Sequence, residues 1–236
     1  MLESRLVEKA ILAFDIETTG LDPKYAKITV VRTEDIFTGE KTAYEYARVE
    51  AEISDLQQQI REKHACADLE DLRISLEVAQ EELCKMTENL IKQFDSASSL
   101  CAFNGIRFDI PFMHTALDLP VEITTSWVLK TTDILECSRL LHGKTFKLDL
   151  LCEYNGLPMK SASGLAAIAM AKEGRFSELR DYCADDVSIL CNLYHKRHIK
   201  NPRTDQSIDL AEWSHVDLYD LLCALEFETD MSEADS

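Results

Sequence analysis

The chain has 236 residues, of which 46% are hydrophobic and 29% are charged, and its formal net charge is −18. This length suits one globular domain with an elaboration, or two small domains. No apolar run approaches the roughly 20 residues that a membrane-spanning helix requires, and the charged start of the chain does not resemble a signal peptide. We therefore expect an intracellular protein without a membrane segment.

Most of the negative charge is concentrated in two segments. Residues 50–90 contain 11 acidic and four basic residues, and residues 209–236 contain nine acidic residues and no Lys or Arg. A basic run remains at 194–203. The acidic segments oppose non-specific binding to long polyanions, whereas the rest of the chain can still hold phosphates locally. This distribution indicates a short, end-bound substrate or a recruiting partner.

The eight cysteines are expected to be reduced thiols. They form no Cys-x-x-Cys pair, and several lie within apolar runs. A zinc site is the alternative, but no ligand spacing supports one.

The first part of the chain is predicted to form β-structure. Residues 10–16 (AILAFDI) form a compact apolar strand candidate that ends in a TTGLDP turn. Two further strands are predicted at 27–37 and 40–50, joined at Thr38-Gly39. The alternation of apolar and polar residues in the second of these supports a hairpin.

Residues 52–94 differ in character, because glycine and proline disappear and apolar residues follow a heptad spacing. We expect either one long interrupted helix or an antiparallel helical hairpin. The apolar seam has two interpretations. It packs on the sheet, or it forms a projecting coiled coil for self-association or a protein partner. The seam residues are Leu69, Leu72, Leu76, Ala79, Leu83, Met86 and Leu90.

The remaining elements alternate between strands and helices, which predicts an α/β fold with a central mixed sheet flanked by helices. Gly143 and Gly156 stand where helices are expected to stop. The predicted elements are a strand at 98–103, a helix from Pro111, a strand end at 128–134, two short helices within 135–160, helices at 164–173 and 176–195, an acidic amphipathic segment at 209–228 and a disordered end at 229–236.

The first acidic motif is AFDIETTG, in which Asp15 and Glu17 are two residues apart. On a β-strand, residues i and i+2 project from the same face, so Phe14 and Ile16 point to the opposite face. One strand therefore offers two carboxylates to one site and anchors itself in the core. The alternative is the exposed polar face of an edge strand.

The second motif is FNGIRFDIPFM, in which Asp109 lies among apolar residues. Carboxylates in apolar surroundings lose hydration unless a cation joins them, which makes Asp109 a candidate metal ligand. The alternative is a helix cap, since Asp before Pro111 is a common one. Asn104 stands beside Gly105, a pair that is typical of turns, so a turn residue is one interpretation of Asn104.

The third motif is YCADD, in which Tyr182 and Asp186 are four residues apart and share one face of a helix. Asp185 lies about 100° away around the helix and is expected to face solvent or to act as a cap. A phenol one turn before a carboxylate can hold a water that a carboxylate-bound metal has acidified. The alternative is an ordinary tyrosine on a helix surface.

Together and in this order, the motifs closely resemble those of the DEDD superfamily of 3′–5′ exonucleases, which share a ribonuclease-H-like fold. The Tyr-x-x-x-Asp spacing resembles the tyrosine branch, because the histidine branch would need His where this chain has Asp181. The segments look most similar to the proofreading exonuclease domains of family B DNA polymerases and to their stand-alone relatives. The resemblance covers about residues 10–50 and 96–195.

The resemblance implies a centre for two Mg²⁺ or Mn²⁺ ions. Asp15 would bridge both ions. Glu17 and Asp186 would complete the shell of the first ion, and Asp109 would hold the second. Tyr182 would orient the attacking water. The residues implied to contact the substrate are Thr18, Thr19, Leu21, Asn104 and Phe108. Lys147 is a candidate phosphate contact, with a solvated helix lysine as the alternative, and Asp133 matches an acidic position near such sites.

The resemblance therefore predicts an α/β, ribonuclease-H-like enzyme that acts on single-stranded 3′ ends and releases nucleoside 5′-monophosphates. DNA is somewhat favoured over RNA, although no motif reports contacts to the 2′-OH. We expect residues 1–51 and 95–208 to form the enzymatic domain, 52–94 a helical insertion, and 209–236 an acidic helix with a disordered end. The alternatives are a subunit that acts through a partner, an end-binding protein without turnover, and an interaction protein built on this fold.

Overall fold

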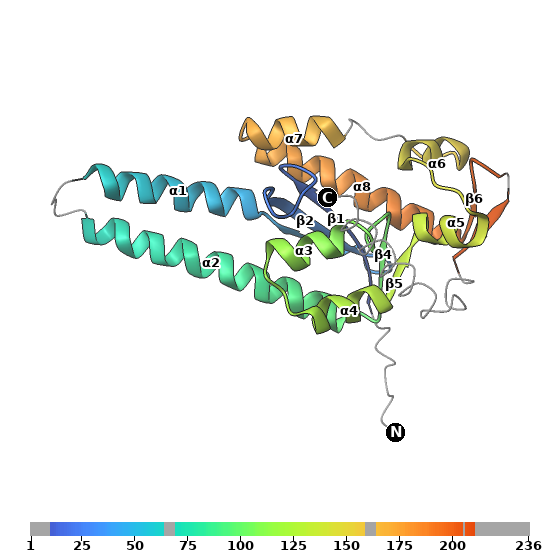
Figure 1. The fold of residues 1–236 in the computed structure, drawn as a ribbon, viewed down its shortest axis with the longest axis horizontal. Helices are drawn as coiled ribbons and strands as arrows, with labels where there is room; N and C mark the ends of the chain where they lie inside the picture. The colour runs from blue at the N-terminus through green and yellow to red at the C-terminus, as the bar shows by residue number, and fades with distance from the viewer. Residues whose placement is uncertain (1–9, 64–68, 159–163, 205, 211–236) are drawn as a thin grey trace, which may run out of the picture.

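The computed structural model describes residues 10–63, 69–158, 164–204 and 206–210. Its centre is a five-stranded sheet in the order β3-β2-β1-β4-β5 (Figure 1). The first three strands along the chain pair in antiparallel fashion, whereas β4 is parallel to β1 and to β5. The strands are β1 (Ile11–Thr18), β2 (Ile28–Asp35), β3 (Lys41–Tyr44), β4 (Ser99–Ala102) and β5 (Thr131–Asp133). The predicted α/β class with a mixed sheet is confirmed.

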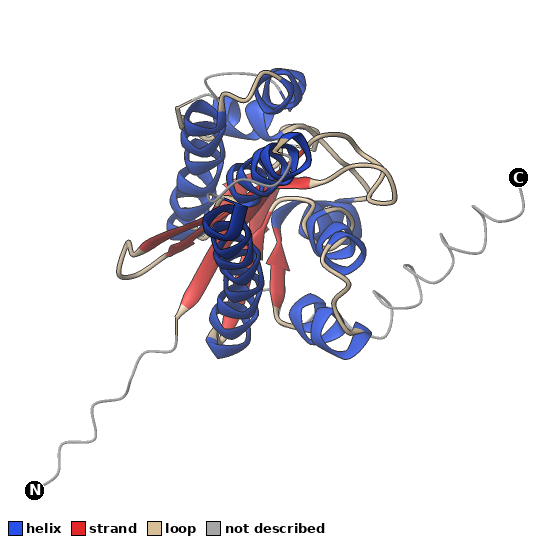
Figure 2. Ribbon diagram, turned by 90° about the vertical axis from the view of Figure 1, so that its left-hand side faces the viewer, coloured by secondary structure: helices blue, strands red, loops and turns tan. Residues whose placement is uncertain are grey.

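Helices cover both faces of this sheet (Figure 2). Leu12, Phe14 and Ile16 of β1 pack in one apolar cluster with residues of α2, α3 and α4. Ala13 packs in the opposite cluster, together with residues of α5, α6 and α8. The helices are α1 (Tyr46–Glu62), α2 (Leu69–Ser96), α3 (Asp109–Ala116), α4 (Val121–Leu129), α5 (Ile134–His142), α6 (Leu148–Tyr154), α7 (Gly164–Lys172) and α8 (Phe176–Lys196). The alternation of β1 therefore directs Asp15 and Glu17 toward the α8 face.

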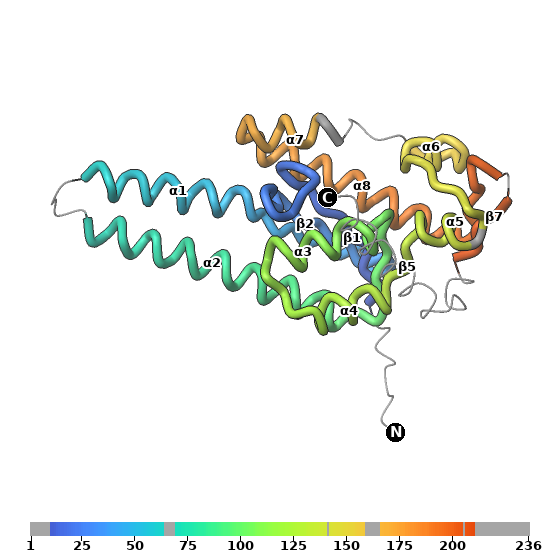
Figure 3. The backbone as a smooth tube through the Cα atoms, viewed as in Figure 1, coloured from blue at the N-terminus to red at the C-terminus, as the bar shows by residue number. Residues whose placement is uncertain are grey.

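The segment that carries the heptad seam forms an antiparallel hairpin of α1 and α2, which extends beyond the sheet (Figures 1 and 3). The end of α2 packs on the sheet, where Leu90 and Phe94 are fully buried. The beginning of α2 lies beside α1, away from the sheet (Figure 3). The interpretation that the seam packs on the sheet therefore holds for the end of α2. The rest of α2 lies against α1, and a coiled coil for self-association or for a protein partner stays a prediction.

The predicted β-hairpin is shorter than expected, because β3 ends at Tyr44 and α1 begins at Tyr46. The prediction of a strand as far as residue 50 is wrong. Tyr46 and Val49, three residues apart, are both buried on one face of the helix. The Tyr46 hydroxyl also lies 3.2 Å from Thr87 Oγ1 of α2. Packing against α2 thus outweighs the strand propensity of this aromatic and β-branched stretch.

Two further elements were not predicted. One is α4, whose Trp127 is fully buried and donates from Nε1 to Asp95 Oδ1 at 2.7 Å. The other is a small sheet of β6 (His198–Lys200) and β7 (Ser207–Asp209) after α8. Gly143 and Gly156 have a φ of 62°, so both helix stops fall as predicted. The predictions for 211–236 lie outside the described residues.

The six described cysteines are all reduced, as expected, and five of them are buried. Among the described helices, none combines the length and the hydropathy of a membrane-crossing segment.

Phe94 is the first position at which this packing can be tested. Its ring centroid lies 5.0 Å from that of Phe14 and 4.7 Å from that of Trp127. We expect Phe94→Ala to lower the free energy of unfolding by about 3–5 kcal/mol, because it leaves a cavity between α2 and the sheet. Urea unfolding monitored by circular dichroism measures this change. Lys92→Ala, at an exposed position on the same helix, should change it by less than about 0.5 kcal/mol. Equal effects of the two substitutions would contradict this account of the core.

Candidate metal centre

Three carboxylates converge between β1 and α8. Asp15 and Glu17 come from β1, and Asp186 comes from the middle of α8. One ligand oxygen from each lies within 4.8 Å of the others. The contact of α8 with β1 and β2 brings Asp186 over the acidic face of β1, where it is only 3% exposed. The prediction that these three side chains share one site is thus matched by the geometry.

Asp109 reaches the same part of β1 from the first turn of α3. Its Oδ1 accepts a hydrogen bond from the Ile16 backbone N–H at 3.0 Å. This N–H is available because β4 pairs with β1 only through Ala13. The N-cap of α3 is Phe108, so the capping alternative for Asp109 is wrong. Burial, followed by the charge of Asp15, raises the pKa of Asp109 well above its usual value.

Tyr182 and Asp186 lie on the buried side of α8, as the four-residue spacing predicts. Tyr182 is 4% exposed and belongs to a small apolar cluster with Val30 and Leu179. The alternative of an ordinary surface tyrosine is therefore wrong. Asp185 is exposed, as predicted from its angle around the helix.

Cys183 also belongs to this site, although the sequence did not single it out. It is fully buried, and its Sγ lies 3.5 Å from Asp15 Oδ2 and 3.6 Å from the Asp15 carbonyl oxygen. Burial and the charges of Asp15 and Glu17 raise the pKa of this thiol well above its usual value. Cys183 therefore remains a neutral donor beside the acidic cluster. Its position next to Tyr182 in the motif was the only signal that could have drawn attention to it.

Asp133 has a structural role near the site. Its carboxylate, at the end of β5, accepts hydrogen bonds from the backbone N–H groups of Asn104, Ile106, Leu135 and Glu136, at 2.9–3.2 Å. Burial raises the pKa of Asp133 to about 6. The carboxylate caps α5 and holds the segment that leads into Asp109.

The close approach of that segment explains Gly105. A Cβ at this position would lie 2.5 Å from the Ala102 Cβ and 3.2 Å from the Phe14 ring. The preceding residue, Asn104, adopts a φ of 68°, which confirms its alternative role as a turn residue.

The residues that the resemblance implies as substrate contacts come from several elements, and the first of them lie at the end of β1 and in the turn after it. The Thr18 hydroxyl donates to the Gly20 carbonyl at 2.6 Å, and the Thr19 hydroxyl accepts from the Lys27 N–H at 2.9 Å. Both threonines therefore shape the turn after β1. Leu21 is 78% exposed.

The two remaining candidates stand at the starts of two helices, Phe108 at the N-cap of α3 and Lys147 at the N-cap of α6. Phe108 packs on Phe112 with a centroid distance of 5.6 Å. Lys147 is exposed at the N-cap of α6, on a different element from the four carboxylates. Its alternative as a solvated lysine fits this exposure, and the substrate roles of all these residues stay predictions.

The donor set fits a hard divalent cation. Three converging carboxylates with a fourth beside them supply oxygen ligands only, which Mg²⁺ and Mn²⁺ prefer. Burial and, after it, the charge of Asp15 raise the pKa of Asp109, so the grouped carboxylates are unfavourable without a cation. A bound cation would offset both the repulsion and the lost hydration.

Comparisons with known proteins agree with this fold. The family B DNA polymerase from the hyperthermophilic archaeon Pyrobaculum calidifontis has a similar structure, with a TM-score of 0.52 and 18% sequence identity. The similarity covers 80% of this chain and 24% of the polymerase chain, so the protein spans about a quarter of the polymerase's length. A search of curated proteins finds no significant match. A family model described as the RNase_H superfamily matches residues 12–198, and the chain therefore belongs to the RNase_H superfamily.

Proposed function

We propose that this protein is a metal-dependent 3′–5′ exonuclease that hydrolyses phosphodiester bonds at single-stranded nucleic-acid ends. The observation that carries this proposal is the convergence of Asp15, Glu17 and Asp186, with Asp109 beside them on the Ile16 N–H. Membership of the RNase_H superfamily supports a nuclease-type function. The resemblance of the three motifs to the tyrosine branch of the DEDD exonucleases supports the 3′–5′ direction.

In the proposed reaction, the four carboxylates would hold two Mg²⁺ or Mn²⁺ ions. Asp15 would contribute to both ion sites, Glu17 and Asp186 to the first, and Asp109 to the second. Bound ions of this kind lower the pKa of water and stabilise the departing 3′ oxygen. The Tyr182 hydroxyl, one helical turn before Asp186, orients the attacking water. Water gives up a proton and adds to phosphorus, the bond from phosphorus to the 3′ oxygen of the shortened strand breaks, and that oxygen takes up a proton. A nucleoside 5′-monophosphate leaves.

DNA is the preferred substrate in this proposal. The similar polymerase structure and the motif resemblance both involve DNA polymerases. The substrate end would meet the exposed Leu21 in the turn after β1 and the Asn104–Phe108 segment, on which the last bases pack.

Metal binding should stabilise the folded protein, because the cation relieves carboxylate repulsion. We expect Mn²⁺ at about 100 times its dissociation constant to raise the free energy of unfolding by about 2.7 kcal/mol. Thermal unfolding in Mn²⁺ and in EDTA measures the shift. Asp186→Asn should lose most of the shift, and Asp185→Asn, the exposed neighbour on α8, should retain it. Equal shifts in the two variants would place the cation elsewhere.

Cleavage should depend on the same carboxylates. Asp15→Ala and Asp186→Ala should each reduce the rate by roughly a thousandfold or more, because several kcal/mol of transition-state stabilisation are lost. Tyr182→Phe should lower the rate less and leave Mn²⁺ affinity unchanged. A 5′-labelled single strand incubated in Mg²⁺, Mn²⁺ or EDTA reports the rates as a ladder that shortens from the 3′ end.

Three controls make this assay decisive. Asp185→Ala should cleave as the unmodified protein does. Circular single-stranded DNA should resist cleavage, since it has no end. A matched RNA strand measures the sugar preference. Degradation of the circle would overturn the exonuclease proposal, and an unchanged rate in Asp15→Ala would overturn the assigned site.

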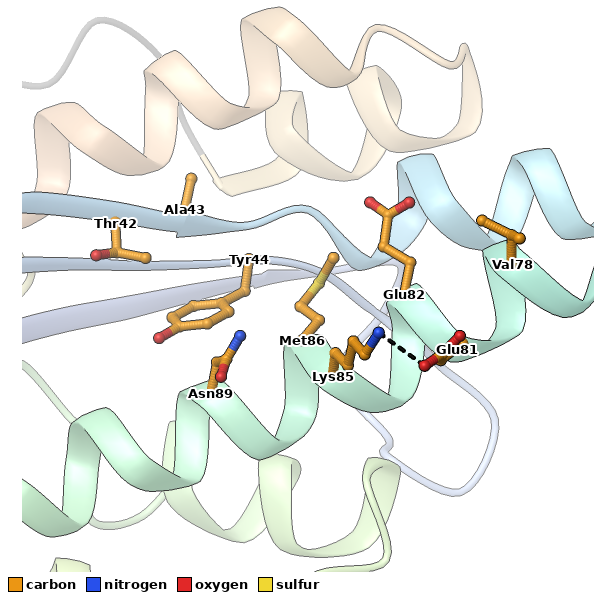
Figure 4. A pocket seen from close by; sticks show the side chains of 9 residues that line it. All are labelled: Thr42, Ala43, Tyr44, Val78, Glu81, Glu82, Lys85, Met86 and Asn89. Carbon is orange, nitrogen blue, oxygen red and sulfur yellow. Dashed lines mark ion pairs between the residues drawn. The ribbon is translucent and has the colours of Figure 1, made fainter. Parts of the chain in front are cut away.

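We also propose that the α1–α2 hairpin binds a partner protein with a basic surface, rather than a second copy of this chain. Ile74 and Val78 on α2 are 52% and 60% exposed. Val78 borders a groove of about 540 Å³ between β3 and α2, with Met86 and Tyr44 beside it (Figure 4). The two helices contain 11 acidic and five basic residues, so the hairpin is negatively charged and attracts a protein surface that is basic.

The charge on the hairpin opposes self-association through it. We expect the protein to sediment as a monomer at both low and high salt. The double variant Ile74→Glu/Val78→Glu should sediment identically. A dimer that this variant abolishes would contradict the proposal and favour a second copy as the occupant. Point variants are preferable to deletion of 52–94, because Leu90 and Phe94 belong to the core.

A further inference from the structure

A second cavity lies at the C-terminal end of α8, whereas Asp186 lies in the middle of this helix. It has a volume of about 520 Å³ and is lined by Phe37, Tyr194, His195, Arg197 and Leu210. Tyr194 follows Asp186 by eight residues, which corresponds to roughly 12 Å along a helix. The cavity is therefore separate from the metal centre.

The walls of this cavity combine aromatic surface with positive charge. Phe37, in the turn between β2 and β3, is 56% exposed, and its ring centroid lies 6.5 Å from that of His195. Arg197 is exposed and has its Nε 3.4 Å from Asp209 Oδ1. Lys196, Lys200 and Arg203 extend the exposed basic surface beside it. This cavity suits an apolar segment that carries carboxylates.

The chain itself supplies such a segment. Leu210 lines the cavity, and residues 211–236 follow it directly. They contain eight acidic residues and no Lys or Arg. Their apolar residues include Trp213 and a helix-like spacing at 218, 221, 222 and 225. Apolar side chains in this number need a surface to cover them.

We propose that residues 211–228 dock in cis on this cavity, with Trp213 against Phe37 and Tyr194 and the acidic residues facing the basic surface of 195–203. The connection is short, because Leu210 is already at the cavity, so closing the loop costs little entropy. A covalently attached segment also has a high effective concentration, which favours it over the same segment of a second copy.

The two tryptophans make this docking measurable in the full-length chain. Trp127 is fully buried in the core, so Trp213→Phe reports the signal of Trp127 alone, and subtraction gives that of Trp213. We expect acrylamide to quench Trp213 several-fold less than it quenches a free peptide of residues 209–228. Phe37→Asp/Arg197→Glu should raise the quenching of Trp213 toward the value of the free peptide.

Two controls separate docking from other causes. Lys172→Glu reverses an exposed charge on α7 and should leave the quenching of Trp213 unchanged. Unchanged quenching of Trp127 in the Phe37→Asp/Arg197→Glu variant shows that it is folded. Quenching of Trp213 in the full-length chain that equals its quenching in the free peptide would overturn the proposal. Shielding that disappears on dilution would also overturn it, because that result means docking between two copies.

Discussion

The structure depends on the two different faces of β1. Leu12, Phe14 and Ile16 bind the strand to the cluster under α2, whereas Asp15 and Glu17 project to the α8 side. The apolar face anchors the strand firmly enough to hold two carboxylates close together in a partly buried place. A strand without that anchor would relieve the repulsion by turning its acidic face to water. The core contacts of α2 therefore sustain a site on the other side of the sheet.

Backbone N–H groups and one thiol, all of them neutral, position the acidic side chains of the site. The Ile16 N–H fixes Asp109, the Cys183 thiol lies beside Asp15, and Asp133 gathers four backbone N–H groups around the segment before α3. These contacts orient the acidic side chains without cancelling their charge. The charge remains available for a cation, which is what a hydrolytic metal centre requires.

The sequence predicted the parts of the site that follow from local periodicity. Asp15 and Glu17 share a face because strand residues alternate, and Tyr182 and Asp186 share a face because helical residues repeat every turn. The convergence of the two pairs depends on α8 crossing β1, which no local pattern encodes. The hydrogen bond between Asp109 and Ile16 joins residues 93 positions apart, so capping by Asp109 was an equally reasonable local interpretation. The start of α1 was missed for a similar reason, since the helix at Tyr46 is stabilised by contacts with α2, from a distant part of the chain.

The contact between Asp109 and β1 has a consequence for how the site tolerates sequence change. The donor is a main-chain N–H, which every amino acid except proline supplies. Residue 16 can therefore vary to suit the packing under α2 while Asp109 keeps its anchor. The sequence of the core on the α2 side of the sheet can therefore change almost independently of the acidic site on the α8 side, although both use residues of β1.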